Sequence, residues 1–163
     1  MAEHLEISTG DKAAKYALLY EQIVALADGE TDLIALMANV ASMVHHTFGF
    51  LWTGFYRVVE SELVLGPFQG PLACTRIPYG RGVCGTAWAQ HSTLVVPDVE
   101  AFPGHIACSS SSRSEIVVPV RFNGNIIAVF DIDSANLATF DDVDAHWLER
   151  IASVFDASNL YTD

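Results

Sequence analysis

The stretch EIVVPVRFNGNIIAVFDID, residues 115–133, carries the clearest structural pattern in the chain. Two runs rich in branched apolar residues flank Asn123-Gly124, the strongest short signal for a β-hairpin. Side chains alternate along a strand, so the second run has two distinct faces. One face carries Ile127, Val129, Asp131 and Asp133, and the other carries Ile126, Ala128, Phe130 and Ile132. The stretch therefore predicts an antiparallel hairpin with two acids on one face.

The length of the turn determines on which face Glu115 lies. A two-residue turn pairs residue 122 with 125 and places Glu115 opposite Ile132, away from the two acids. A three-residue turn with Gly124 in the left-handed conformation pairs 121 with 125 and places Glu115 opposite Asp131. Three acids sharing a face without a basic residue are costly unless they bind a cation or hold a proton. The second register thus predicts an ammonium site or a general acid, whereas strand-end acids can also simply reach water.

Helical periodicity appears at both ends of the chain. Residues 11–28 have apolar side chains three and four apart, which predicts a helix. Residues 29–48 predict a second helix, with Thr31 as N-cap and Asp32 in its first turn. Residues 139–160 predict a third, with acids at its start and one apolar face.

The remaining segments favour short strands and loops. Strands are expected at 50–59, 62–68 and 93–98, and residues 71–92 form a loop with a strand around Cys74 and a helix at 82–90. These elements predict an α+β fold in which an antiparallel sheet carries the N- and C-terminal helices on one face. Loops 67–92 and 98–114 would cover the other face.

Composition restricts the class of protein. The chain has 163 residues, 51% of them hydrophobic, which suits a single domain with a substantial core. The net charge is −12, with only eight Lys and Arg, so partners such as nucleic acid or an anionic membrane are not expected. This charge favours a cationic or zwitterionic ligand, or serves only solubility. No apolar run is long enough to span a membrane and no secretory leader is recognisable, which predicts a cytoplasmic protein.

The three cysteines do not form a structural disulfide or zinc pattern. Their spacings, C-x9-C and C-x23-C, lack the short knuckle of zinc sites, although His105 before Cys108 leaves a Cys3His site open. Cys84 has apolar neighbours and suits an inert, buried position. Cys74 and Cys108 lie in polar loop sequence, which favours reactive thiols.

The segment GRGVCG, residues 80–85, fits the pattern G-x-G-x-x-G of dinucleotide-binding loops. That pattern is meaningful only between a buried strand and a long helix of a parallel unit. Here CTRIPY precedes it and Pro97 follows soon after, so we expect these glycines to serve turns and close packing.

Four segments together carry a resemblance to a known family. They are FLWTGFYRV, LVLGPFQGPLACTRIPYGRGVCGTAW, VVPDVEAFPGHIACSSSSRSEIVVPV and VFDIDS. This set resembles the free methionine-(R)-sulfoxide reductases, a family built on a single GAF domain. The resemblance extends from about Tyr16 to the C-terminal helix, and implies one GAF domain over residues 1–163 with a core at about 16–159.

The resemblance implies a fold, an activity and a set of site residues. It implies a six-stranded antiparallel sheet and the reduction of free methionine-(R)-sulfoxide, with thioredoxin as the reductant and no cofactor or metal. It assigns catalysis to Cys108, resolution to Cys74, and an accessory or alternative resolving role to Cys84. The substrate-site residues that it implies are Trp52, Glu115, Asp131 and Asp133. It also allows a homodimer.

This chemistry fits the residues. A thiolate at Cys108 would attack the sulfoxide sulfur and become a sulfenic acid, which Cys74 would convert to a disulfide. Glu115 would protonate the leaving oxygen, and Asp131 and Asp133 would hold the substrate ammonium. Trp52 would wall the pocket or serve as a core aromatic, and the four serines at 109–112 are assigned no chemistry. The alternatives are a non-catalytic GAF sensor of a small ligand and a zinc-bearing redox sensor.

Overall fold

The structure of the protein is a computed structural model that describes residues 4–158 and residue 160. Its elements are α1 (Lys12–Ala27), α2 (Leu33–Phe48), β1 (Trp52–Val59), β2 (Glu62–Gln69), β3 (Arg76–Pro78), α3 (Gly82–Gln90), β4 (Leu94–Val96), the 3₁₀ turn η1 (Val99–Ala101), β5 (Ser114–Phe122), β6 (Asn125–Ser134) and α4 (Asp142–Ala157). Within the described residues, no helix is both long and apolar enough to cross a bilayer.

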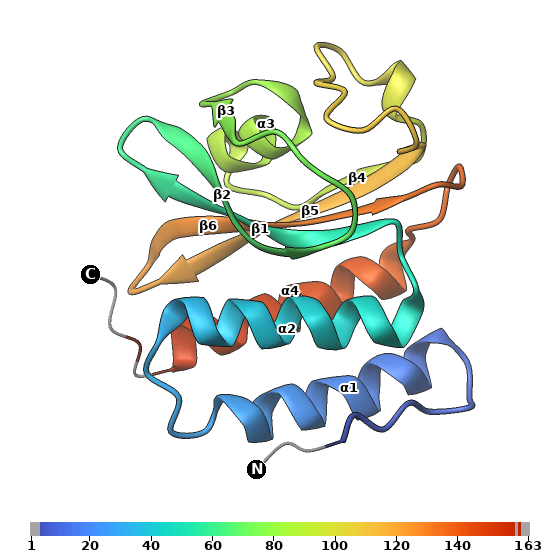
Figure 1. The fold of residues 1–163 in the computed structure, drawn as a ribbon, viewed down its shortest axis with the longest axis vertical. Helices are drawn as coiled ribbons and strands as arrows, with labels where there is room; N and C mark the ends of the chain where they lie inside the picture. The colour runs from blue at the N-terminus through green and yellow to red at the C-terminus, as the bar shows by residue number, and fades with distance from the viewer. Residues whose placement is uncertain (1–3, 159, 161–163) are drawn as a thin grey trace.

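The six strands form one antiparallel sheet in the order β3-β2-β1-β6-β5-β4. Helices α2 and α4 cover one face of the sheet, which we call the helix face. Helix α3 and the loops that follow β2 and β4 lie over the opposite, pocket face (Figure 1). The α+β class and the six-stranded antiparallel sheet predicted from the sequence are confirmed.

The N-terminal helix occupies a different layer from the one expected. Helix α1 packs against α2 and α4, and thus forms an outer layer on the helix side rather than covering the sheet (Figure 1). Asp144 of α4 connects these layers, since it accepts a 2.7 Å hydrogen bond from the Tyr16 hydroxyl and pairs with Lys12 at 2.7 Å. The apolar side of α1 is therefore buried against helices.

Helix α2 begins one residue later than predicted. Asp32, not Thr31, is the N-cap, and its side chain accepts a hydrogen bond from the Ala35 N–H at 2.8 Å. A carboxylate at this position also interacts favourably with the helix dipole. Asp141 caps α4 in the same manner, through a reciprocal capping box with Asp144.

The β5–β6 hairpin closes through a two-residue turn. Phe122 pairs with Asn125, while Asn123 and Gly124 both adopt positive φ, at 51° and 79°. This geometry is the one that Asn-Gly favours in tight hairpins, because both residues tolerate the left-handed region. The three-residue turn considered from the sequence is therefore wrong.

A β-bulge follows the turn and changes the register by one residue. Val120 pairs with Ala128, so that Ile127 is an extra residue on β6. Ile127 packs against the helix-side core together with Ala128. Its predicted place on the face of the two acids is wrong, because a bulge interrupts the strict alternation of side chains.

The bulge brings Glu115 to the face of the two acids. Glu115 lies opposite Asp133, neither opposite Ile132 nor opposite Asp131 as the two predicted registers require. Residues directly opposite in an antiparallel pair project to the same face. The three acids therefore share the pocket face. The two-residue register is correct at the turn, but the bulge shifts it by one residue before Glu115.

Candidate active site

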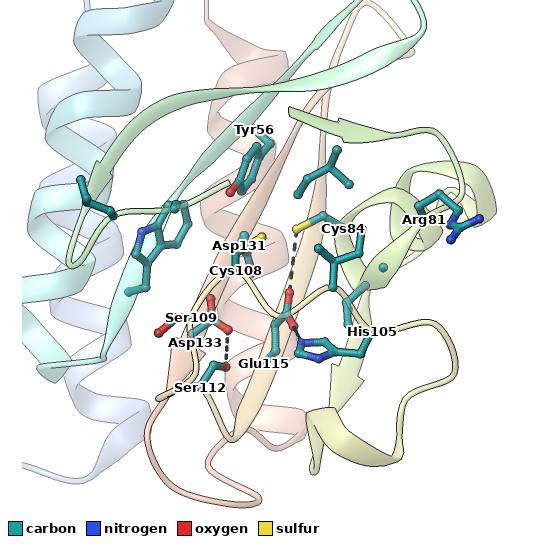
Figure 2. Close-up of a pocket in the computed structure, with 17 residues that line it drawn as sticks. Tyr56, Arg81, Cys84, His105, Cys108, Ser109, Ser112, Glu115, Asp131 and Asp133 are labelled. Carbon is teal, nitrogen blue, oxygen red and sulfur yellow. Dashed lines mark hydrogen bonds and ion pairs between the residues drawn. The ribbon is translucent and has the colours of Figure 1, made fainter. Parts of the chain in front are cut away.

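The pocket face contains a cavity lined in part by Cys108 (Figure 2), which forms a disulfide with Cys74. Strands β1, β5 and β6 form its floor, and α3 and the loop segments 72–73 and 105–112 form its walls. Its lining includes six residues predicted from the sequence, namely Trp52, Cys84, Cys108, Glu115, Asp131 and Asp133. The cavity volume is about 40 Å³, enough for a few water molecules because one water needs about 10–15 Å³ by this measure.

The two central carboxyl groups are buried. Glu115 is 5% exposed and Asp131 is 6% exposed. The Oδ1 atom of Asp131 has no hydrogen-bond partner. Cys84 Sγ lies 3.8 Å from Glu115 Oε1 and donates a long, weak hydrogen bond to it. A buried carboxyl oxygen without a partner is costly, and indicates a position where a ligand supplies the missing interaction.

Burial shifts the acids of the pocket toward their protonated forms. Burial, followed by the neighbouring Asp131 charge, raises the pKa of Glu115 well above its usual range. Burial, followed by the Asp133 charge, raises the pKa of Asp131 in the same direction. Burial raises the pKa of Asp133 to about 6, while its hydrogen bond with Ser112 opposes the shift. The site therefore favours binding of a cation or storage of a proton.

Neutralising charges are scarce around these acids. In the described part of the chain, no Lys or Arg forms an ion pair with Glu115, Asp131 or Asp133. The nearest basic ring is that of His105, whose Nε2 lies 3.9 Å from Glu115 Oε2, and burial lowers the pKa of His105. Arg81 lines the pocket but its guanidinium points away from the acids (Figure 2).

Two of the three cysteines, Cys84 and Cys108, line the cavity, and Cys74 does not. Cys74 and Cys108 are joined by a disulfide with a Cα–Cα distance of 5.2 Å, and Cys84 on α3 is free and buried. The Tyr56 hydroxyl donates to the carbonyl of Cys74 at 2.9 Å, which holds that loop against β1. Because Cys74 and Cys108 are bonded to each other, the Cys3His arrangement is not formed in this structure.

The aromatic wall of the pocket comes from one face of β1. Trp52 and Tyr56 stack with ring centroids 5.8 Å apart, and Gly54 lies between them in sequence. A Cβ at Gly54 would lie 2.4 Å from the Cβ of Phe68 and 2.7 Å from the Trp52 ring. The absence of a side chain at this position therefore makes room for the indole.

Two pocket residues were missed by the sequence reasoning. Tyr56 lies on the same face of β1 as Trp52, and strand alternation could have indicated it. Ser112 was assigned no chemistry, yet it is buried and its hydroxyl donates to Asp133 Oδ1 at 2.5 Å. Nothing in the run of four serines distinguishes Ser112, because its role depends on where the loop meets β6.

The glycines of residues 80–85 have the packing role that was expected. Gly82 begins α3 with φ at +62°, and a Cβ at Gly85 would lie 2.6 Å from the carbonyl oxygen of Pro78. These positions require close backbone approach and a left-handed residue, for which glycine is suited. The short helix α3 follows β3 in an antiparallel sheet, so the context of a dinucleotide-binding unit is absent.

Comparison with known proteins agrees with this architecture. The family model of the GAF domain matches residues 32–155. The fold and this match define the chain as a GAF domain. Helix α1 lies before the matched range.

Individual relatives narrow the assignment. The chain is 57% identical to GAF domain-containing protein A of Dictyostelium discoideum, covering 96% of this chain and 99% of the relative. It is 42% identical to the free methionine-R-sulfoxide reductase of Escherichia coli, covering 94% and 93%. The free methionine-R-sulfoxide reductase of Neisseria meningitidis, solved in complex with its substrate, matches with a TM-score of 0.93 and 52% identity, covering 96% and 95%. The chain belongs to the free methionine-(R)-sulfoxide reductase family.

Proposed function

We propose that this protein reduces free L-methionine-(R)-sulfoxide to methionine. Relatives that bear the name of this activity support the proposal, as does the relative solved in complex with its substrate. The observation that carries it is the shared cavity: Cys108 lines the same pocket as the buried carboxyls of Glu115 and Asp131. A nucleophile, an acid and an anionic anchor are the groups that this reaction requires. The epimer is taken from the family alone.

In the proposed first step, the Cys108 thiolate attacks the sulfoxide sulfur. Glu115 is held protonated by its surroundings, and donates its proton to the sulfoxide oxygen. The oxygen is transferred to Cys108, which becomes a sulfenic acid while methionine leaves. The carboxyl is thus the general acid and the cysteine is the two-electron reductant.

In the proposed second step, the Cys74 thiol condenses with the sulfenic acid of Cys108. A water molecule leaves and a disulfide forms. The Cys74–Cys108 disulfide of the structure supports this order, because it is the bond that such a condensation produces. Cys84 is the accessory partner: burial, followed by the Asp131 charge, raises the pKa of its thiol and disfavours the nucleophilic thiolate.

Thioredoxin is the proposed reductant of this disulfide. One thiol of thioredoxin attacks a sulfur of the disulfide and forms a mixed disulfide. The second thiol of thioredoxin then breaks this bond, so that Cys74 and Cys108 become thiols and thioredoxin leaves as a disulfide. A disulfide that forms and breaks in each turnover is catalytic rather than structural, and is compatible with a reducing compartment.

Charge pairing explains why the substrate is a free amino acid. The substrate α-ammonium lies against Asp131 and Asp133, and supplies the cation that the pocket lacks. A methionine within a polypeptide has no α-ammonium, and therefore cannot supply this charge. The same cation makes Cys108 easier to ionise, because the negative neighbours otherwise raise a thiol pKa. Trp52 packs on the methyl-sulfur end of the substrate.

The cavity also supports a change of the loop during turnover. With the disulfide formed, its volume of about 40 Å³ is too small for a whole amino acid. Reduction frees Cys108 from Cys74, so that the loop of residues 104–112 can move and admit the substrate. This loop carries Cys108 between two partners, the sulfoxide and Cys74.

The test is NADPH consumption with thioredoxin, thioredoxin reductase and free methionine-(R)-sulfoxide. We expect turnover in the wild type and in the exposed-surface control Asp142→Asn, and none in Cys108→Ser. Glu115→Gln should lower kcat by about 10²–10⁴-fold, the usual contribution of a general acid. Full turnover in Cys108→Ser would exclude the proposed nucleophile.

The same assay separates the alternative of a ligand-binding sensor. A sensor would bind methionine sulfoxide, observed as heat in a titration, and consume no NADPH.

The proposed effect of the substrate ammonium on the ionisation of Cys108 has its own measurement, the rate at which iodoacetamide alkylates Cys108 in the reduced protein. Saturating methionine should increase that rate, and an unchanged rate would contradict the role of the ammonium.

A further inference from the structure

A free thiol meets two carboxyl groups at the centre of the pocket. The Sγ of Cys84 and one carboxyl oxygen each of Glu115 and Asp131 all lie within 4.8 Å of one another. Figure 2 shows these three side chains in the pocket, and all three residues are buried. We propose that these three side chains bind a zinc ion, and that zinc bound there excludes the amino-acid substrate.

The unpartnered oxygen of Asp131 is an independent sign of a cation ligand. Asp131 is only 6% exposed, and no donor forms a hydrogen bond with its Oδ1. Asp131 lines the cavity between Cys84 and Asp133 (Figure 2). A buried oxygen of this kind is satisfied by a proton, an ammonium group or a metal ion.

The donor atoms favour zinc over harder cations. Zinc binding displaces the protons of Cys84 and Glu115 to solvent. The resulting thiolate is a soft ligand that zinc accepts, whereas Mg²⁺ and Ca²⁺ prefer sites built only of oxygen. Zinc binds sulfur at about 2.3 Å and carboxylate oxygen at about 2.0–2.2 Å, so ligand atoms around one ion lie about 3.5 Å apart. The Cys84 Sγ to Glu115 Oε1 distance is already 3.8 Å.

The surroundings complete the requirements of a zinc site. The cavity of about 40 Å³ has room for a water molecule as fourth ligand, which leaves one exchangeable position. His105 lies 3.9 Å from Glu115 Oε2, where it can orient this carboxyl from outside the ligand set. The chain carries a net charge of −12, which attracts cations toward the pocket.

Exclusion of the substrate follows from the shared anchor. Asp131 is the residue to which we assign the substrate ammonium, and a zinc ion bound to its carboxylate would repel that ammonium group at short range. This second half of the inference rests on the proposed function, whereas zinc binding itself does not. Zinc would thus act as a competitive inhibitor.

The binding test uses the oxidised protein, in which Cys84 is the one free thiol of the three cysteines. Calorimetric titration with zinc chloride should show one ion per chain. Cys84→Ser and Asp131→Asn should each weaken zinc affinity by more than the roughly 10–100-fold that loss of an outer contact costs. The control Asp142→Asn should leave it unchanged. Substitution by Co²⁺ should give a thiolate-to-metal absorption band that is lost in Cys84→Ser.

Absence of binding to the wild type would overturn the zinc site, as would unchanged affinity in both ligand variants. Exclusion is tested in the reduced double variant Cys74→Ser/Cys108→Ser, which performs no turnover. Methionine-(R)-sulfoxide at about ten times its own Kd should lower the apparent zinc affinity about tenfold, because a competitor raises the apparent Kd by a factor of one plus its concentration divided by its Kd. Zinc affinity that does not change with sulfoxide would refute a shared site. Failure of the sulfoxide to bind at all would count against the proposed function. Zinc binding itself is tested separately, by the calorimetric titration of the oxidised protein.

Discussion

The two faces of β6 bury neighbouring residues in opposite environments. On the helix face, Phe130 and Ile132 are fully buried among apolar side chains. On the pocket face, Asp131 is almost as deeply buried, with one oxygen that has no partner. Burial on the first face stabilises the fold through the hydrophobic effect, whereas burial on the second costs free energy. The apolar face thus holds in place a pocket that would not be stable by itself, as is common for binding sites.

The largest effect is expected on the helix face. Phe130 stacks on Phe55 with centroids 4.3 Å apart. Phe130→Ala should lower the free energy of unfolding by about 3–5 kcal/mol, since it removes a buried ring and leaves a cavity. Urea denaturation measures this loss. Phe130→Leu, which retains most of the apolar volume, is the matched control and should lose clearly less; equal losses would contradict a packing cause.

A smaller effect is expected where the pocket wall meets β2. Gly54→Ala places a Cβ 2.4 Å from that of Phe68 and 2.7 Å from the Trp52 ring. Overpacking of this kind costs about 1–3 kcal/mol, and displacement of the indole should also raise KM for the sulfoxide. Denaturation and steady-state kinetics measure the two effects. Wild-type stability together with a wild-type KM would contradict this prediction, because it would show that Phe68 and Trp52 move aside at no measurable cost.

The pocket face should make stability depend on pH. Aspartate in an unfolded chain titrates near 3.9, whereas burial raises the pKa of Asp133 to about 6. The folded protein therefore holds this proton more tightly, so the contribution of Asp133 to stability is highest below about pH 4 and decreases by up to about 2 kcal/mol as the pH rises to 6. The raised pKa values of Glu115 and Asp131 act in the same direction, because these groups too bind their protons more tightly in the folded protein.

The difference between wild type and Asp133→Asn isolates this contribution. Urea denaturation at a series of pH values should give a flatter profile for the variant between about pH 4 and 6. Asp141 has a lowered pKa and acts in the opposite direction in both proteins, so it cancels in the difference. Parallel profiles would mean that Asp133 does not titrate in this window.

The smallest change in stability is expected for Asp131→Asn, which affects function instead. Removal of a buried, unpartnered carboxyl should leave the free energy of unfolding unchanged or increase it by about 0.5–2 kcal/mol. The KM for the sulfoxide should rise at least about tenfold, because loss of one partner of a buried charge pair costs about 2 kcal/mol or more. A clear loss of stability would place Asp131 with the structural residues of the helix face.

Local patterns predicted most of the elements. The Asn-Gly turn, the helix at residues 82–90 and the terminal helices were all expected from signals that act within a few residues. The prediction was wrong at the start of α2, where two adjacent residues, Thr31 and Asp32, can both act as the N-cap. It was also wrong for α1, whose apolar side packs on helices instead of the sheet, because periodicity identifies a buried side without identifying its partner.

The site itself combines both kinds of information. The sequence by itself determined that Asp131 and Asp133 share a face and that the loop cysteines differ from Cys84, because alternation and local polarity are properties of short segments. Only the tertiary structure decided that Glu115 joins these acids, since the bulge at Ile127 offsets the two-residue turn. It also decided the burial of Ser112, and it confirmed the pairing of Cys74 with Cys108 across 34 residues that the resemblance to the family implied. Such contacts depend on how distant segments pack, which no local pattern encodes.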